Sequence, residues 1–273
     1  MMNYSVLTTV YKNDNPEDLM QSIDSMLNQT VVTDDYVIVA DGPLSNELYA
    51  VLEEYSSKYD FFRIIQLDEN SGLGVALREG LSKCKNELVA RIDADDLSLR
   101  ERCELQLKRF DECPELAIIG SDMYEFDNDP DEIKDIKVMP HTCEEIYEYG
   151  KRRNAFNHSS VMYKKSIVEK YGSYSSKRRS QDVELFSKII FNGEMCENIN
   201  IPLIKFRCGD SRVKRKKKWS NVKSDLSVFY SNYKMGYSVF FDYLYVVIIQ
   251  IGFWILPEKV AGILYSRIFR SKL

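Results

Sequence analysis

The stretch Leu88-Val89-Ala90-Arg91-Ile92-Asp93-Ala94-Asp95-Asp96 joins a short apolar run to three carboxylates within four residues. The run before Asp93 has the composition of a buried strand. Three adjacent carboxylates repel one another unless a cation sits among them, and Mg²⁺ or Mn²⁺ suits such a site because phosphate oxygens can complete its coordination. The stretch therefore predicts a strand ending in a metal site. The alternative is that Asp95 or Asp96 caps a following helix.

Strand-like and helical segments alternate ahead of this stretch. Apolar, β-rich runs occupy residues 4–11, 36–40 and 62–66, and helical periodicity occupies 16–28, 46–58 and 74–84. The alternation predicts an α/β fold with a mostly parallel sheet covered on both faces. After the carboxylates we expect a helix over 99–110, a strand over 117–124, a further strand within 152–163 and a helix over 181–191.

Polar residues gather where the predicted strands end. They follow Val10, form Asp41-Gly42, begin again at Asn70 and continue at Asp93. Parallel sheets bind ligands at the carboxyl ends of their strands, so these clusters predict one binding site. Asp41 suits either a nucleoside contact or a plain turn. The segment from Asn70 to Gly74 matches neither a dinucleotide fingerprint nor a phosphate loop, although Arg78 lies one helical turn further on.

Two later segments add polar candidates. Asp182 is placed in the first turn of a predicted helix, where the dipole favours the ionised carboxylate that a general base needs. The same position also suits ordinary helix capping. His158 stands in Asn157-His158-Ser159-Ser160. A lone histidine of this kind is more often structural than catalytic, and the local sequence leaves both readings open.

Composition narrows the class of protein. The chain has 273 residues and a net charge of −5, which argues against a general nucleic-acid binder. Six cysteines show no C-x-x-C spacing, so we expect reduced thiols in a cytosolic protein. The first residues lack the pattern of an export signal and run into a predicted strand. We therefore expect the catalytic body to stay inside the cell.

Read in order, these segments resemble the inverting glycosyltransferase family 2 of GT-A fold, a Rossmann-like nucleotide-diphospho-sugar transferase fold. They are most similar to bacterial enzymes of exopolysaccharide, capsule and O-antigen assembly. The likeness extends over about residues 4–212, and it depends on the order and spacing of several short matches. The matching stretches are 5–11, 22–30, 37–43, 70–80, 90–96, 157–162 and 181–186.

The resemblance implies a metal-dependent enzyme that moves a sugar from a nucleotide diphosphate to a hydroxyl of a glycan or lipid-linked sugar. The expected donor is a UDP-hexose or UDP-N-acetylhexosamine, and the expected setting is surface polysaccharide synthesis. The implied nucleotide-sugar contacts are Thr9, Val10, Tyr11, Asp41, Asn70, Arg78, Asp93 and Ala94. Asp95 and Asp93 would hold Mn²⁺ or Mg²⁺, Asp182 would be the general base, and His158 and Gln181 would line the acceptor side.

Three positions depart from the family pattern. Gln181 stands where the family commonly has Glu, which bears on acceptor contacts and on the pKa of Asp182. Phe186 replaces a common Trp, and Ala40 replaces an acid often found beside Asp41. The last change bears on the nucleoside contacts at that strand end.

The tail differs in character from the rest of the chain. We expect a GT-A catalytic domain over 1–212 and a basic, aromatic-rich helical extension over 213–273. Residues 205–218 contain eight basic residues and one acidic residue, and 239–256 is apolar but interrupted by Asp242 and Gln250. These interruptions favour an amphipathic helix on the inner face of the cell membrane over a spanning helix or a soluble cap. The acceptor would then be carried on polyprenyl diphosphate, and the basic run could meet its diphosphate.

Two other functions fit parts of the pattern. A nucleotidyltransferase that makes the donor would share a metal site at a strand end, but the chain lacks a glycine-rich basic phosphate loop near its N-terminus. A membrane-associated partner that kept the fold and lost turnover would keep the strand-end residues.

Overall fold

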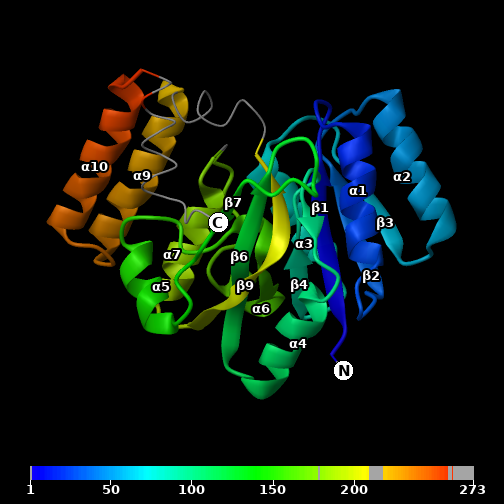
Figure 1. Ribbon diagram of the computed structural model, residues 1–273, viewed down its shortest axis with the longest axis horizontal. Coiled ribbons are helices and arrows are strands. Elements are labelled where there is room, and N and C mark those ends of the chain that lie inside the picture. Colours follow the sequence, from blue (N-terminus) through cyan, green and yellow to red (C-terminus); the bar gives the residue numbers. More distant parts are fainter. Residues whose placement is uncertain (1, 178, 209–217, 258–259, 261–273) are drawn as a thin grey trace.

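A nine-stranded mixed sheet forms the centre of the molecule (Figure 1). The computed structural model describes residues 2–177, 179–208, 218–257 and 260. The strands are β1 (Tyr4–Val10), β2 (Asp35–Ala40), β3 (Phe62–Gln66), β4 (Leu88–Arg91), β5 (Leu97–Ser98), β6 (Leu116–Phe126), β7 (Asp135–Lys137), β8 (Met162–Lys164) and β9 (Met195–Arg207). Their order is β3-β2-β1-β4-β8-β6-β9-β5, with β7 beside β6.

The sheet has two parts of different character. The first four strands in this order are all parallel, and the long pair β6–β9 is parallel as well. β8 lies antiparallel between β4 and β6 and joins the two parts. The predicted mixed, mostly parallel α/β sheet is therefore confirmed.

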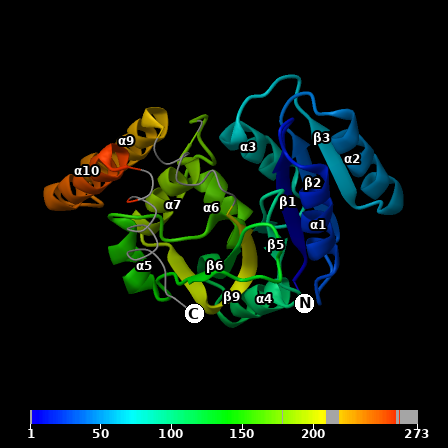
Figure 2. The ribbon, with the colours of Figure 1, turned by 45° about the horizontal axis from the view of Figure 1, so that its top comes forward.

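Helices cover both faces of the sheet (Figure 2). One core holds α1 (Pro16–Leu27), α2 (Asn46–Lys58) and α4 (Arg102–Glu112), and the other holds α3 (Leu73–Lys83), α5 (Cys143–Gly150), α6 (Lys165–Lys170) and α7 (Gln181–Phe191). Along β2, Tyr36 and Ile38 enter the first core while Val37 and Val39 enter the second. This explains why the strand is apolar without a break.

Two more helices form a hairpin beside the sheet, α9 (Trp219–Met235) and α10 (Phe240–Ile255) (Figures 1 and 2). Gly236 ends α9 with a φ of +87°, a left-handed conformation that favours glycine. The hairpin rests on α7, where Asn232 Nδ2 donates to Ser187 Oγ over 2.9 Å. The boundary expected at 212/213 lies outside the described residues and stays a prediction.

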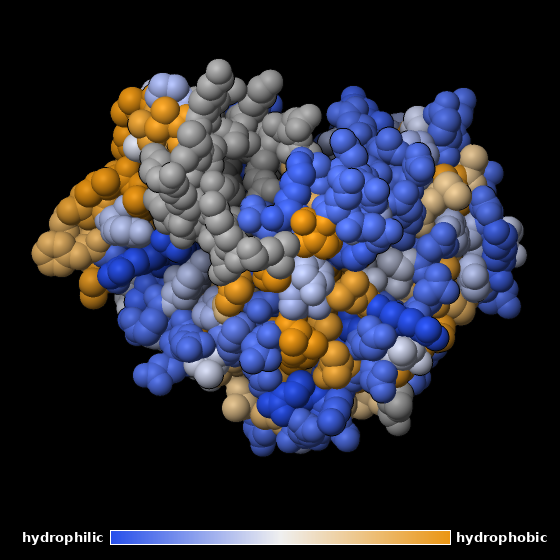
Figure 3. Space-filling view, in the orientation of Figure 1, coloured by the Kyte–Doolittle hydropathy of each residue, from blue (hydrophilic) through white to orange (hydrophobic). Residues whose placement is uncertain are grey.

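The outer side of α10 is apolar. Phe241, Leu244, Ile248 and Ile255 recur at helical spacing and are all exposed, Phe241 by 75%. Figure 3 shows this face as an orange area over the hairpin. Across the described part of the chain, the helices are too short or too polar to cross a bilayer.

The segment after the three carboxylates differs from one expectation. Asp95 and Asp96 do not cap a helix, because the short strand β5 follows them and pairs with β9. α4 begins only at Arg102, after Glu101 as its cap residue. The capping alternative for Asp95 and Asp96 is therefore wrong.

Candidate active site

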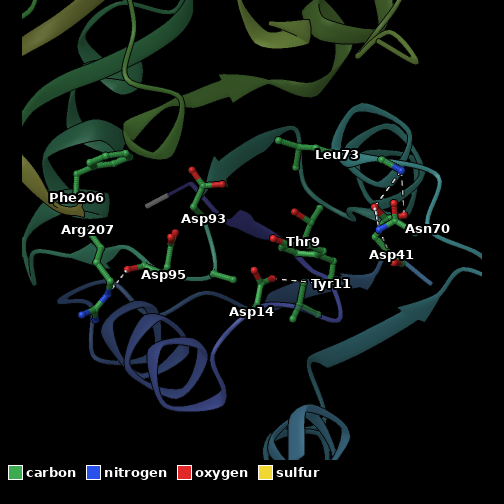
Figure 4. A pocket seen from close by; sticks show the side chains of 13 residues that line it. Thr9, Tyr11, Asp14, Asp41, Asn70, Leu73, Asp93, Asp95, Phe206 and Arg207 are labelled. Carbon is green, nitrogen blue, oxygen red and sulfur yellow. Dashed lines mark hydrogen bonds between the residues drawn. The ribbon is translucent and has the colours of Figure 1, made fainter. Parts of the chain in front are cut away.

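The carboxyl ends of β1, β2 and β4 meet at one edge of the sheet and surround a cavity of about 430 Å³, the strand-end cavity (Figure 4). Its lining includes eight of the residues expected to bind the nucleotide sugar or the metal. The cavity is lined by Thr9, Val10, Tyr11, Asp14, Asp41, Asn70, Gly72, Leu73, Asp93, Ala94, Asp95, Phe206 and Arg207. The strand order β2-β1-β4 places these segments next to one another.

An acidic cluster lies at one side of this cavity, and two of its three members, Asp93 and Asp95, line it. Asp93, Asp95 and Asp96 each offer a carboxylate oxygen, and these oxygens lie within 4.8 Å of one another. Asp96 is buried; its Oδ1 accepts the Arg207 N–H over 2.9 Å, and its Oδ2 has no hydrogen-bond partner among the described residues. Burial and the charges of Asp95 and Asp93 raise the pKa of Asp96 well above its usual value. A divalent cation fits this set of hard oxygen donors and would relieve their repulsion.

Two neighbours fix the backbone and side chain of Asp93. The buried guanidinium of Arg91 forms an ion pair with its carboxylate. The Asp93 N–H donates to Ser159 Oγ over 3.0 Å. The serine belongs to a 3₁₀ turn at His158–Ser160, so the segment around His158 supports the acidic cluster from behind.

Asp41 holds the turn that precedes α3. Its carboxylate accepts the backbone N–H groups of Ser71, over 2.7 Å, and of Gly72, over 3.0 Å, together with Asn70 Nδ2 over 3.2 Å. A Cβ on Gly42 would lie 2.5 Å from the Asn70 nitrogen, so the two turns touch. Asp41 therefore has a structural role at the cavity wall, and both roles expected for it remain compatible with its position.

Two polar lining residues were missed from the sequence. Asp14 follows β1, and its Oδ2 accepts the Tyr11 N–H over 2.9 Å. Burial, with the charges of Asp95 and Asp93, raises the pKa of Asp14 to about 7. Arg207 ends β9; its Nε donates to the Asp95 carbonyl oxygen over 3.1 Å, and its Nη2 lies 3.1 Å from Asp18 Oδ1. Asp14 had a usable signal, because it also follows a strand end.

Asp182 lies at the start of α7, a little apart from the strand-end cavity. Asn154 Nδ2 donates to its Oδ2 over 2.8 Å. Burial raises the pKa of Asp182, whereas the Val183 N–H and the charge of Arg91 lower it. Burial also raises the pKa of Tyr174, and the charges of Asp182 and Asp93 add to that rise.

The other expected site residues take up different positions. His158 packs against Tyr174 and Phe186, and its Nε2 lies 3.0 Å from the Tyr174 hydroxyl. Burial and the nearby Arg91 hold the pKa of His158 well below its usual value, so the ring is neutral. Gln181 is buried beside the start of α3, since a Cβ on Gly74 would lie 3.3 Å from its Cγ.

Arg78 lies outside the strand-end cavity. It projects from the exposed side of α3, where its side chain is 44% exposed and lies 4.0 Å from Glu79. A nucleotide contact by Arg78 would require its side chain to turn toward the cavity.

The chain matches known proteins along most of its length. The model of the family described as glycosyl transferase family 2 matches residues 5–172. The amylovoran biosynthesis glycosyltransferase AmsE of Erwinia amylovora is 31% identical over 97% of this chain and 98% of its own. The UDP-Gal:alpha-D-GlcNAc-diphosphoundecaprenol beta-1,3-galactosyltransferase of Escherichia coli is 30% identical over 99% of this chain and 98% of its own.

Solved structures of similar fold include two proteins in complex with a nucleotide sugar. The mannosyltransferase PcManGT of Pyrobaculum calidifontis, in complex with GDP-Man and Mn²⁺, gives a TM-score of 0.67 at 12% identity, covering 100% of this chain and 76% of its own. S. aureus TarS 1-349 in complex with UDP-GlcNAc gives 0.63 at 15% identity, covering 97% of this chain and 71% of its own. These likenesses concern the fold. With the family match and the two relatives, they identify the chain as a member of glycosyl transferase family 2, a glycosyltransferase of GT-A fold.

Proposed function

We propose that this enzyme transfers a hexose or N-acetylhexosamine from its UDP derivative to a hydroxyl of a sugar carried on a polyprenyl diphosphate, with inversion at the anomeric carbon. The observation that carries the proposal is the strand-end cavity, in which Asp93 and Asp95 of the acidic cluster lie beside the polar ends of β1 and β2. The Escherichia coli relative, named for a UDP-Gal donor and a diphosphoundecaprenol-linked acceptor, supports this choice of substrates.

In this proposal the strand-end cavity holds the donor. Thr9, Val10, Tyr11, Asp41 and Asn70 would surround the nucleoside. Asp95 and Asp93 would hold Mn²⁺ or Mg²⁺, which neutralises the charge that develops on the leaving diphosphate. The neighbouring Arg91 would keep the Asp93 carboxylate in place. Ala94 would lie against the sugar.

Asp182 would act as the general base on the acceptor side. Its carboxylate takes the proton of the acceptor hydroxyl while that oxygen forms a bond to the anomeric carbon of the donor. The bond from that carbon to the diphosphate oxygen breaks, and the electron pair leaves with UDP. Attack from the face opposite the diphosphate inverts the anomeric carbon, so an α-linked donor gives a β-glycoside. Gln181 would contact the acceptor, and His158 would support the site from beneath.

We also propose that the protein lies on the inner face of the cell membrane through α10. The exposed apolar side of that helix, with Phe241 and Ile248, supports a position within the lipid headgroup region. This position would bring the active site to a lipid-linked acceptor without a spanning helix.

A transfer assay tests the proposal. Purified protein is incubated with Mn²⁺, a panel of UDP- and GDP-sugars and a decyl diphosphate ester of N-acetylglucosamine, and UDP or GDP release is measured with product mass. We expect transfer from one UDP-sugar. Asp182→Asn should lower kcat by about 10²- to 10⁴-fold, the usual contribution of a general base.

Asp111→Asn is the matched control, because Asp111 is an exposed aspartate at the end of α4. It should transfer at the wild-type rate. Absence of transfer from every donor would contradict the proposed reaction. Full activity of Asp182→Asn would contradict the assignment of the base.

A further inference from the structure

The loop that leads into α7 ends in a strained residue, Ser180. Its φ of 59° and ψ of 21° are left-handed, a conformation that residues with a Cβ adopt rarely and at a cost in free energy. Such a conformation persists only where neighbouring groups hold it. The proposed base, Asp182, is two residues further along the chain. The conformation of Ser180 therefore sets the direction in which α7 begins and in which Asp182 projects.

The Ser180 hydroxyl bonds to another helix instead of to its own. Ser180 is the cap residue of α7, and a serine at such a position ordinarily accepts a backbone N–H of the first turn. Within the described structure, Ser180 makes no capping bond of this kind. Its hydroxyl donates instead to Oδ1 of Asp225, a residue of α9. The turn before α7 is therefore held from outside that helix.

A second hydrogen bond joins the same two segments. Ser224 Oγ donates to the Arg179 carbonyl oxygen over 2.9 Å. Two consecutive residues of α9 thus hold two consecutive residues of the loop before α7. Each of these contacts spans 45 residues of sequence, so both depend on how the α9–α10 hairpin is seated on the catalytic body.

α10 holds the other oxygen of the Asp225 carboxylate. Gln250 Nε2 donates to Asp225 Oδ2 over 3.3 Å, and both residues line a cavity of about 230 Å³ between α10 and the catalytic body. Gln250 and Asp242 are the polar residues that interrupt the apolar run of this helix. Asp242 also points inward, since its Oδ1 lies 2.6 Å from Arg152 Nε. The two interruptions therefore belong to the inner side of α10, and Gln250 connects that helix to the loop before α7 through Asp225.

We propose that Asp225 is a positioning residue for the base: it holds Ser180 in its left-handed conformation and so fixes the direction of Asp182. This inference rests on the proposed function, in which Asp182 takes the acceptor proton. Without Asp225, Ser180 would relax toward a favoured conformation and the first turn of α7 would shift. The α9–α10 hairpin would thus take part in catalysis as well as in the proposed contact with the membrane.

Hydrogen exchange at the start of α7 tests the inference without turnover. The Glu184 N–H donates to the Ser180 carbonyl oxygen over 3.0 Å, so its exchange in the full-length protein reports whether this turn is held. Asp225→Ala should speed that exchange by about tenfold, because a hydrogen bond to a charged group is lost. Asp225→Asn keeps an acceptor for the Ser180 hydroxyl and should exchange at a rate close to wild type.

Transfer kinetics test the effect on the base. Asp225→Ala should lower kcat by about 10- to 100-fold, since a small displacement of a catalytic group has effects of that size. The affinity for UDP with Mn²⁺, measured by calorimetry, should stay at the wild-type value, because no described residue of the hairpin lines the strand-end cavity. Asp225→Asn should recover most of kcat.

Ser180→Gly separates positioning from a general loss of stability. Glycine adopts a positive φ without steric cost, and it has no hydroxyl that could donate to Asp225. Adding Asp225→Ala to Ser180→Gly should therefore change neither the Glu184 exchange nor kcat by more than about twofold. A purely structural role of Asp225 would instead give the same loss in both backgrounds.

Asn232→Ala is the matched control. Asn232 also joins the hairpin to α7, but through Ser187 in the body of that helix and not at its start. The variant should lower the Tm, because a buried hydrogen bond is lost. It should leave both the Glu184 exchange and kcat at their wild-type values.

Three results would overturn the inference. Wild-type Glu184 exchange in Asp225→Ala would show that Asp225 does not hold the start of α7. Equal effects of Asp225→Ala in the wild-type and Ser180→Gly backgrounds would show that it does not act through Ser180. An unchanged kcat in Asp225→Ala would show that the base does not depend on it. If the exchange rates change as expected but the wild-type protein transfers no sugar, the proposed reaction fails and the contact with Ser180 stands.

Discussion

At the scale of single residues, Asn154 donates a hydrogen bond to Asp182, the proposed general base. A base must be ionised, and burial already raises the pKa of Asp182. The rate should therefore fall as the pH falls through a value above that of an ordinary aspartate, about 3.9. The amide of Asn154 stabilises the ionised carboxylate and so opposes the effect of burial.

Asn154→Ala should shift the acid side of the pH profile of kcat/KM to higher pH. The loss of one hydrogen bond to a charged group corresponds to about one pH unit. The measurement is the initial rate of transfer across pH. Asn192→Ala is the control, because Asn192 is exposed at the end of α7 and its side-chain Nδ2 donates to the Lys188 carbonyl oxygen. An unchanged acid side would mean that Asp182 does not limit the rate.

The same shift in pKa has a consequence for stability. The folded protein holds the Asp182 proton more tightly than the unfolded chain does. As the pH rises from below the pKa of the unfolded chain to above the raised pKa of the folded protein, the contribution of Asp182 therefore lowers the free energy of unfolding. The proposed function therefore needs Asp182 ionised at neutral pH, whereas the fold is more stable when Asp182 is protonated. Asp182→Asn removes this ionisation, and its inactivity should not come from unfolding.

Arg91 is the buried cation behind the acidic cluster. It pairs with Asp93, while its Nε and Nη1 have no hydrogen-bond partner among the described residues. Its charge also lowers the pKa of Asp182. Arg91→Met should therefore raise the KM for the donor and shift the acid side of the rate profile upward in pH.

Arg91→Lys separates the two effects. It keeps the charge but loses the planar geometry, so it should raise the donor KM by about tenfold while the pH profile stays close to wild type. Thermal unfolding of both variants checks that the fold persists. Equal pH profiles for Arg91→Met and wild type would contradict the electrostatic link to Asp182.

At the scale of elements, the outer side of α10 makes a direct prediction about membranes. Phe241→Asp together with Ile248→Asp places two charges on the exposed apolar side, and neither residue lines the cavity between α10 and the catalytic body. The double variant should stay unbound when wild-type protein floats with vesicles that contain acidic lipids. Transfer to the short-chain decyl acceptor in detergent-free buffer should remain.

Ser231→Asp together with Lys234→Asp is the control, since both residues are exposed on α9. This variant should still float, with at most a modest loss from its added negative charge. If the α10 variant floats as well as wild type, the apolar side of α10 is not the membrane contact. Association between copies of the chain would then be the other explanation for that surface, and the mass in solution would show it.

The helices and strands also show how much of the fold could be predicted from the sequence. The bounds of α2, β3 and α7 were predicted to the residue, because continuous apolar runs or a clear helical period define them. β9 was missed, since Pro202 and register shifts against β6 remove any regular alternation. The sequence left a helix cap at Asp95 or Asp96 as an alternative, because local residue preferences do not indicate that β5 pairs with β9.

The site, like the fold, could be predicted from the sequence only in part. Residues at the ends of β1, β2 and β4 could be located from sequence, because parallel strands bring their carboxyl ends together. Arg207 and Asn154 could not, since their roles depend on approaches between segments more than 25 residues apart. The roles of Asp182 and His158 entered only through the family resemblance, and they stay predictions.

At the scale of the whole molecule, donor binding should stabilise the fold only when a divalent ion is present. A ligand at one hundred times its Kd adds about 2.7 kcal/mol to the free energy of unfolding, which raises the Tm of a protein of this size by several degrees. We expect UDP with Mn²⁺ to produce such a rise and UDP with EDTA to produce none.

Asp95→Asn should lose the rise that depends on Mn²⁺, while Asp111→Asn should keep it. The readout is the Tm from thermal unfolding followed by circular dichroism. A full rise in the presence of EDTA would show that UDP binds without metal, and the acidic cluster would need another explanation.

The apolar side of α10 has a kinetic consequence. An enzyme held on a surface meets a lipid-bound substrate by diffusion in two dimensions, so the rate depends on how densely that substrate covers the surface. Mixing more inert lipid into the acceptor-bearing vesicles would dilute the acceptor over more area and slow the reaction, even though its amount per volume stays the same. The water-soluble donor would keep an ordinary volume concentration. Activity would then respond to the lipid composition of the membrane as well as to the supply of nucleotide sugar.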